Sequence, residues 1–253
     1  MPIEKTYRDS IEIIDISKVT TPYHRTYKTL ILTFQSKVLQ SLLDNALIKP
    51  IDDLLFGSSH GKYHAYEVID NENIIFFLSP IGAPTTVGIL EEMTYRLKIE
   101  NVVMYGSCGL LDHNAAKTNL IIPTKAYRDE GTSYHYMKAS EFVEINHYQI
   151  VEHLFKEANI PYTLGYTWTT DAFYRETEAI VKERIEQGCI TVEMEVSAIQ
   201  AFANLRKIHF YPFLYGADSL IDLVWDKKTL GSEPISSRLW YFRIAVYLAS
   251  KLS

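Results

Sequence analysis

The chain has 253 residues, 47% of them hydrophobic and 22% charged, and 25 Lys and Arg against 31 Asp and Glu give a formal net charge of −6. This length suits one large α/β domain or two small ones, with ample apolar material for one core. A mildly acidic chain without a basic run is unsuited to grasping a phosphate backbone, which excludes polymeric nucleic acid as an expected partner.

The first nine residues alternate charges and lack the apolar centre of a signal peptide. The longest apolar runs, such as residues 74–78, are far too short to span a bilayer, so no membrane partner is expected. The two cysteines, Cys108 and Cys189, lie in unrelated contexts. We therefore expect a reduced, cytoplasmic setting.

Short β-branched or aromatic runs alternate along the chain with longer segments of helical period. In chain order, strands are expected at residues 28–34, 63–69, 74–78, 101–105, 120–122, 163–168 and 209–215. Helices are expected at residues 36–47, after Pro84, and at residues 147–159, 193–207 and 236–252. No repeat, low-complexity tract or linker divides the sequence, so residues 1–253 are expected to form one domain.

This alternation predicts a largely parallel or mixed sheet covered by helices on both faces. Such sheets place ligands at the carboxyl ends of their strands. A site is therefore expected in the loops that follow Phe34, Leu78, Tyr105, Trp168 and Tyr215.

Two glycine turns follow expected strands, at residues 79–84 and 106–109. A glycine at such a turn lets backbone N–H groups approach an anion or a sugar. Gly82 is the candidate in the first turn, and Ser107 in the second could donate to a phosphate or a sugar hydroxyl. Ordinary tight turns explain both segments as well, so neither turn assigns a function by itself.

The segment Thr191-Val192-Glu193-Met194-Glu195 places two carboxylates around a methionine at the start of an expected helix. Acidic residues favour a helix N-terminus, which explains both without any ligand. Alternatively, Glu195 accepts hydrogen bonds from the two vicinal hydroxyls of a ribose, and Met194 packs on the apolar face of the sugar. Spacing alone leaves the two interpretations even.

Asp218 lies just beyond the expected strand 209–215. A carboxyl group at the end of an apolar strand can have a raised pKa and act as a proton donor. An Asx turn or a helix N-cap is the simpler interpretation of this residue alone.

Together these segments resemble one family. They are Ile81-Gly82-Ala83-Pro84, Gly106-Ser107-Cys108-Gly109, Thr170-Asp171-Ala172-Phe173-Tyr174, Val192-Glu193-Met194-Glu195 and Ala217-Asp218. Their order resembles that of the nucleoside phosphorylase superfamily, which includes hexameric purine nucleoside phosphorylases, uridine phosphorylases and methylthioadenosine nucleosidases. The resemblance covers roughly residues 30–220, and the Glu-Met-Glu segment with the Asp-x-Phe-Tyr loop ahead of it is its most specific part.

The resemblance implies a three-layer α/β/α fold with a mixed central sheet, and a homo-oligomer built as a dimer, trimer or hexamer. It implies a small nucleoside substrate, whose N-glycosidic bond breaks through an oxocarbenium-like transition state. Phosphate is a possible co-substrate, and no other cofactor is expected. The histidines show no metal-like spacing with cysteines or carboxylates, so no metal is expected either.

Carried over residue by residue, the resemblance gives the nucleoside a set of contacts. Phe173 would stack on the base, because a flat ring suits a π-face. Glu193 and Met194 would line the base and ribose, and Glu195 would bind the ribose hydroxyls. Ser107 would occupy the position that touches phosphate or another nucleophile.

Asp218 matches the aspartate that donates a proton to the purine N7 as the C–N bond breaks. The leaving base takes up electrons while the sugar becomes oxocarbenium-like, so protonation of the base lowers the barrier. A uracil ring has no N7, and Asp218 therefore favours purines over pyrimidines.

The sequence departs from the family where phosphate is usually held. Phosphorylases of this family carry a Gly-Asp-Pro turn followed by an arginine after the first strand, but residues 33–38 read Thr-Phe-Gln-Ser-Lys-Val. The arginine two positions before the Gly-Ser turn is replaced by Met104, and residues 49–53 lack a third arginine that a neighbouring subunit usually donates. Arginine forks are the usual means of holding phosphate, so a phosphate site should be weak.

Three explanations remain open. In the first explanation, other groups hold phosphate, and the candidates are Lys37, His24, Arg25, Arg128 and His135. In the second explanation, water is the nucleophile and is oriented by Gln35 or Glu193, although Gln35 is not the acid that nucleosidases of this family usually supply. The third explanation is a nucleoside-binding protein without catalysis, which we place behind phosphorolysis and hydrolysis.

Residues 128–136 also resemble a stretch in one branch of the family. Arg128 and His135 could belong to an active-site flap or reach the site of a neighbouring subunit. A surface ion-pair network with aromatic packing is the alternative, and it is favoured for Asp129 and Glu130.

Overall fold

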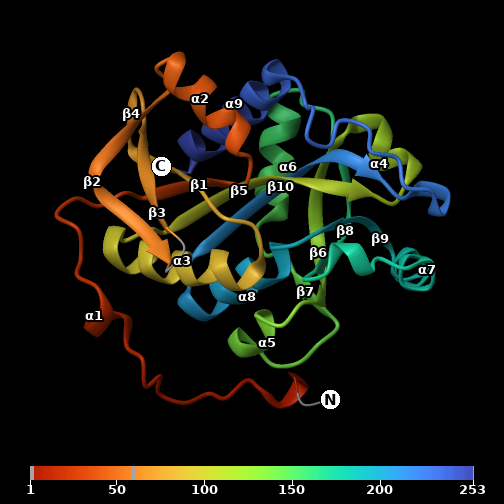
Figure 1. Cartoon of the computed structure of the whole chain (residues 1–253), viewed down its shortest axis with the longest axis horizontal. Helices are drawn as coiled ribbons and strands as arrows, with labels where there is room; N and C mark the ends of the chain where they lie inside the picture. Colours follow the sequence, from red (N-terminus) through yellow and green to blue (C-terminus); the bar gives the residue numbers. More distant parts are fainter. Residues whose placement is uncertain (1–2, 59–60, 253) are drawn as a thin grey trace.

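A ten-stranded mixed sheet forms the centre of the computed structural model, which describes residues 3–58 and 61–252 (Figure 1). The strands are β1 (Thr29–Thr33), β2 (Ile48–Ser58), β3 (Gly61–Val68), β4 (Asn71–Leu78), β5 (Asn101–Leu110), β6 (Leu120–Asp129), β7 (Phe142–Glu144), β8 (Thr163–Thr170), β9 (Cys189–Glu193) and β10 (His209–Ser219). The helices are α1 (Ile16–Val19), α2 (Ser36–Asp44), α3 (Ala83–Leu97), α4 (His113–Thr118), α5 (Ser133–Tyr136), α6 (Tyr148–Glu157), α7 (Glu178–Glu186), α8 (Val196–Arg206) and α9 (Ile235–Lys251), with short 3-10 turns η1 (Ile3–Lys5), η2 (Phe173–Arg175) and η3 (Ile221–Leu223).

Five of the strands pair in a closed ring, and other strands extend the sheet from β5. Neighbours run in the order β10-β6-β8-β9-β5, and β5 also pairs with β10. From β5 the sheet continues as β1-β4-β3-β2. Because β1, β5 and β10 are parallel, their carboxyl ends meet at one edge of the sheet.

Helices cover both faces of this sheet, as Figure 1 shows. Helices α3 and α8 pack on one face, where Val87, Leu90, Met93 and Leu97 of α3 are buried in a single apolar stripe. Helices α2, α6 and α9 pack on the other face and form a second core cluster. The predicted three-layer α/β/α fold with a mixed central sheet is therefore confirmed.

Three sequence expectations about this edge are corrected. Strand β5 runs on to Leu110 and β10 to Ser219, so Ser107 and Asp218 lie within strands rather than in the loops after them. The reason is their mutual pairing, in which Asp218 lies opposite Gly109 across a bulge. Glu193 ends strand β9, and helix α8 begins only at Val196.

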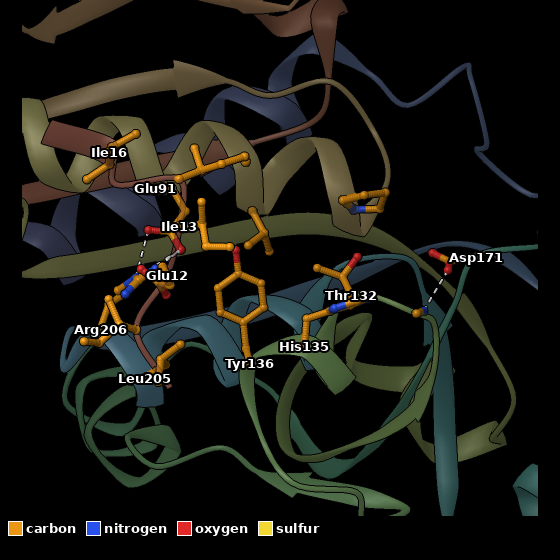
Figure 2. A pocket seen from close by; sticks show the side chains of 16 residues that line it. Glu12, Ile13, Ile16, Glu91, Thr132, His135, Tyr136, Asp171, Leu205 and Arg206 are labelled. Atoms are coloured by element: carbon orange, nitrogen blue, oxygen red, sulfur yellow. Dashed lines mark hydrogen bonds and ion pairs between the residues drawn. The ribbon is translucent and has the colours of Figure 1, made fainter. Parts of the chain in front are cut away.

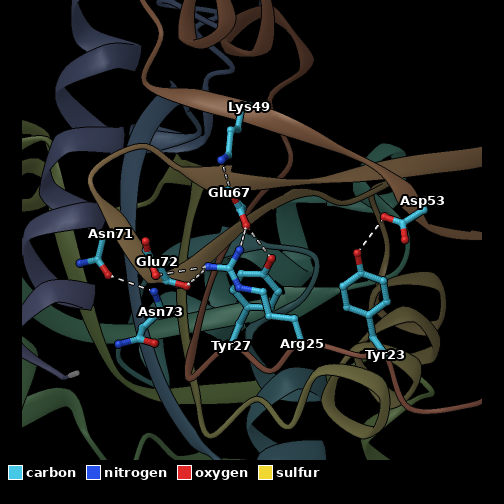
Figure 3. Close-up of polar contacts among 9 residues, drawn as sticks. All are labelled: Tyr23, Arg25, Tyr27, Lys49, Asp53, Glu67, Asn71, Glu72 and Asn73. Carbon is cyan, nitrogen blue, oxygen red and sulfur yellow. Dashed lines mark hydrogen bonds and ion pairs between the residues drawn. The ribbon is translucent and has the colours of Figure 1, made fainter.

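The segment before β1 is tied to the β2–β3 hairpin by polar contacts (Figure 3). Glu67 of β3 forms ion pairs with Arg25 and with Lys49, and it accepts a hydrogen bond from the Tyr27 hydroxyl at 2.9 Å. Tyr23 donates to Asp53 at 2.7 Å. Arg25 therefore serves this anchor and is not available to a phosphate group. Among the described residues, no helix is long and apolar enough to cross a membrane.

Candidate active site

Four carboxyl groups gather where β10, β5 and β9 pair, because Asp218 lies opposite Gly109 and Gly109 lies opposite Val192. They are Glu176 in the loop after η2, Glu193 at the end of β9, Glu195 at the start of α8 and Asp218 on β10. The pKa of the buried Cys108 thiol on β5 is raised by burial and by the charges of Glu193 and Asp218, which places the thiol near both. We call these four acidic residues the carboxyl cluster.

Glu193 organises the turn into helix α8. Its Oε2 accepts the backbone N–H groups of Glu195 and Val196, both at 2.7 Å, and its Oε1 accepts the Thr169 hydroxyl at 2.6 Å. Burial raises its pKa to about 7 although these hydrogen bonds oppose the rise. Both oxygens are occupied, so Glu193 fixes its neighbour Glu195 in place.

Glu195 is joined to the strand-to-helix turn before α3. The backbone N–H of Gly82 donates to Glu195 Oε1 at 2.6 Å. Gly82 has a φ of 107°, a conformation that L side chains rarely adopt. Burial and the neighbouring Glu193 raise the pKa of Glu195 to about 8. Burial therefore favours the protonated form of Glu195, and a ligand donating hydroxyl groups would favour its charged form.

Two exposed aromatic rings lie in η2, which precedes Glu176 in the chain. Phe173 is 51% exposed, and its ring centroid lies 4.2 Å from that of Tyr174, which is 89% exposed. Met194, between Glu193 and Glu195 in the chain, is half-buried. A flat, exposed ring is suited to stack a planar heterocycle.

Asp218 has two neighbours that sequence reasoning missed. The indole N–H of Trp225 donates to Asp218 Oδ2 at 2.9 Å. Burial raises the pKa of Asp218, while Trp225 and Lys228 oppose the rise. Burial and the charge of Asp218 raise the pKa of Glu176 to about 7. No motif marks Glu176. Its position three residues after Phe173 was the one feature of the sequence that could have indicated a place near the site.

The region around Ser107 contains apolar groups. Met104 is 1% exposed within the core. A Cβ atom added to Gly106 would lie 3.4 Å from a ring carbon of Phe34, so this ring packs directly against Gly106 of strand β5. Ser107 itself is half-buried on β5.

Arg128, expected near the nucleophile, has another position and another partner set. It is 2% exposed, and its guanidinium donates to Ser133 Oγ at 2.9 Å, to the Lys138 carbonyl at 2.8 Å and to Ser140 Oγ at 2.8 Å. The cation also lies over the Tyr134 ring, 4.2 Å from its centroid. Arg128 therefore holds the loop after β6 together and has little capacity left for an anion.

Other candidates for the anion also have partners. Gln35, at the start of α2, accepts a hydrogen bond from the buried Arg238 of α9, and Lys37 donates to the Gly231 carbonyl. His24 is exposed, and its ring is tilted against that of Tyr23, with the centroids 4.1 Å apart. Arg238 is the cation that contacts Gln35, and sequence reasoning missed it.

His135 lies in a groove next to the site (Figure 2). The groove has a volume of about 990 Å³ and runs between the N-terminal segment and helices α3, α5 and α8. Pro84 and Asp171 line it, and Asp171 accepts the backbone N–H of Gly131 at 3.0 Å. Since Pro84 follows Gly82 and Asp171 precedes Phe173, the groove borders the carboxyl cluster.

Comparison with known proteins identifies the family of the chain. The family model described as the phosphorylase superfamily matches residues 29–226. The chain belongs to this superfamily. The predicted family is thereby confirmed, and the match includes every member of the carboxyl cluster.

Individual relatives of the superfamily are distant. The chain is 24% identical over 154 residues to a DeoD-type purine nucleoside phosphorylase of Buchnera aphidicola subsp. Schizaphis graminum, covering 60% of this chain and 65% of the relative. It is 26% identical over 140 residues to a guanosine phosphorylase of Halorubrum lacusprofundi, covering 54% and 57%. The chain thus spans less than two thirds of the length of these relatives.

A solved structure shares the fold over most of the chain. It is the AMP nucleosidase from Bacteroides thetaiotaomicron, with a TM-score of 0.69 and 14% identity, covering 90% of this chain and 89% of that chain. At this identity the likeness concerns the fold alone.

Proposed function

We propose that this protein is an enzyme that cleaves the N-glycosidic bond of a purine nucleoside, with water as the nucleophile. The observation that carries the proposal is the carboxyl cluster, whose member Glu176 follows the exposed Phe173 by three positions. Membership of the superfamily and the names of its relatives supply the class of reaction. The cluster supplies the groups that such a reaction needs.

Glu195 anchors the sugar in this proposal. Its Oε1 is held by the Gly82 N–H, and its carboxylate accepts the two vicinal hydroxyls of the ribose. Phe173 stacks on the base, and Met194 lies against the sugar. These contacts place the C1′–N9 bond between the sugar anchor and Asp218.

Asp218 supplies the proton that the leaving base requires. As the C1′–N9 bond breaks, its electron pair goes to the base and the proton of Asp218 goes to N7. Water adds its hydroxyl to C1′ on the opposite face and releases a proton to solvent, from which Asp218 is protonated again. Burial raises the pKa of Asp218, which favours the protonated form that this step starts from.

Charge favours water over phosphate as the nucleophile. Phe34 and Met104 occupy positions where the family places phosphate-binding groups, and Arg128 and Arg25 are engaged elsewhere. A phosphate dianion needs cationic partners to replace its hydration, and these positions supply none, whereas water needs no such partner.

Phosphorolysis is the second candidate. Lys37 and Arg238 lie around Gln35 at the N-terminus of α2, where helix N–H groups also favour an anion. The sequence relatives are named as phosphorylases.

The deciding experiment is a panel of nucleosides assayed by release of free base, with and without inorganic phosphate. Hydrolysis predicts equal base release in both conditions, and ribose as the second product. Release that requires phosphate and yields ribose 1-phosphate would select phosphorolysis. If no nucleoside is cleaved but one raises the melting temperature, the protein binds nucleosides without catalysis.

A further inference from the structure

The Trp225 indole makes a directed contact with Asp218 although it is not buried. Its Nε1 lies 2.9 Å from Asp218 Oδ2, yet 60% of the Trp225 surface is exposed. An indole of this size gains most from burial, so an exposed one that points its only donor at a half-buried carboxyl group is informative.

The backbone around Trp225 is built to hold it opposite Asp218. Ser219 and Asp226 exchange two backbone hydrogen bonds, at 2.9 and 2.8 Å, and so close the chain back on the end of β10. The Thr229 N–H donates to the Ala217 carbonyl at 3.0 Å. The chain that follows Trp225 is therefore tied to Ala217 and Ser219, the two residues that flank Asp218.

The contact determines which oxygen of Asp218 can carry a proton. An indole N–H is a donor only, so the oxygen it contacts acts as an acceptor. When Asp218 is protonated, the proton is then placed on Oδ1. Oδ1 lies 3.4 Å from where a Cβ of Gly109 would be, so this oxygen lies next to strand β5 while Oδ2 faces Trp225.

We propose that Trp225 is a positioning residue for Asp218, whose indole N–H occupies Oδ2 and directs the acidic Oδ1 toward the leaving base. This inference rests on the proposed cleavage of a nucleoside. The segment after β10 then contributes to catalysis through Trp225, which acts on Asp218 and does not touch the reacting atoms.

Other ionisable groups face Asp218 from each neighbouring element. Glu176 follows η2, Cys108 lies on β5, and Lys228 lies on the same segment as Trp225. Glu176 repels the charged form of Asp218, and Lys228 attracts it. Trp225 differs from all three because it is neutral at every pH of interest, so its removal changes orientation and hydrogen bonding without changing the net charge.

The test compares Trp225→Phe with the matched variant Trp240→Phe, which removes a 42% exposed indole from helix α9 away from Asp218. With adenosine as the substrate, Trp225→Phe is expected to lower kcat roughly tenfold while KM changes little, as befits loss of one hydrogen bond to a carboxyl group. Loss of a donor to the carboxylate raises the pKa of Asp218, so the alkaline limb of the kcat/KM profile should move to higher pH. Trp240→Phe should change neither.

A second measurement does not depend on turnover. The carboxyl carbon of Asp218 is observed by NMR in protein labelled at aspartate, and assigned by its absence in Asp218→Asn. Its pKa should rise in Trp225→Phe and stay unchanged in Trp240→Phe. An unchanged pKa, or an unchanged kcat in an active enzyme, overturns the inference. If the wild type cleaves no nucleoside but the pKa of Asp218 rises in Trp225→Phe, the proposed function is wrong while the hydrogen bond from Trp225 to Asp218 is supported.

Discussion

Gly82 and Glu195, separated by 113 positions in the chain, meet through one hydrogen bond in which the Gly82 N–H donates to Glu195 Oε1 at 2.6 Å. The bond joins the N-terminus of α3 to that of α8. It thereby links the glycine turn at residues 79–84 with the Glu-Met-Glu segment, two motifs that sequence analysis treated separately. Its geometry depends on the positive φ of Gly82.

Gly82→Ala is expected to weaken both stability and activity. A Cβ at this position would meet no atom within 4 Å, so the cost is conformational, about 1–3 kcal/mol of unfolding free energy. The strained turn should also move the N–H away from Glu195, so kcat/KM should fall. Denaturant unfolding and base release measure the two effects. Gly88→Ala within α3 is the control, and equal behaviour of both variants would contradict a special role for Gly82.

Glu195→Ala should affect ribosides more than 2′-deoxyribosides. The carboxylate is proposed to accept both vicinal hydroxyls, and a deoxyriboside offers only one of them. The ratio of kcat/KM for adenosine to that for 2′-deoxyadenosine should therefore fall in the variant. Equal losses for the two substrates would argue against direct contact with the hydroxyls.

Stability of the empty protein should fall as the pH rises from about 5 to about 8. Burial raises the pKa of Glu195 to about 8, and that of Glu193 and Glu176 to about 7, above the values of an unfolded chain. Between the unfolded and folded pKa values the native state binds more protons, so each group stabilises the fold at low pH and loses that contribution as the pH passes its folded pKa.

Glu195→Gln removes one of these titrations and should flatten the dependence of unfolding free energy on pH. Glu186→Gln, at an exposed position of α7, should leave the slope as it is in the wild type. Urea unfolding at several pH values provides the measurement. A wild-type stability that increases between pH 5 and pH 8 would contradict the expected direction of the pH dependence.

Asp218→Asn should slow purine cleavage far more than it weakens binding. The amide cannot donate an acidic proton to N7, so kcat is expected to fall by roughly a hundredfold or more, in the range typical of general acids. The dissociation constant for adenosine, measured by calorimetry, should change much less. An unchanged rate would remove Asp218 from the mechanism.

The fold was largely predictable because the apolar runs that form β1, β4 and α3 are long and regular. Strand β2 was missed, since Pro50, two aspartates and Gly57 disfavour a strand locally, and pairing with β3 overrides that preference. The ends of β5 and β10 could not be located, because their last residues are held by each other and not by local propensity.

The candidate site was predictable only where a motif carried it. Gly82, Glu195 and Asp218 were named from the sequence, but the Gly82–Glu195 bond joins residues too far apart for any spacing rule. The partners of Arg128 could not be predicted, because they depend on the fold of the loop after β6, where Arg128 donates to Lys138 and Ser140. No sequence motif marked Trp225, because its contact with Asp218 depends on the reversal of the chain after β10.

In the proposed complex the ribose of the nucleoside lies at Glu195 and its base at Asp218. A crystal structure of the Asp218→Asn variant with adenosine would show this arrangement or refute it. Both ribose hydroxyls are expected within hydrogen-bond distance of Glu195, the purine ring on Phe173, and N7 facing residue 218. A furanose bound elsewhere, or adenine turned away from residue 218, would contradict it.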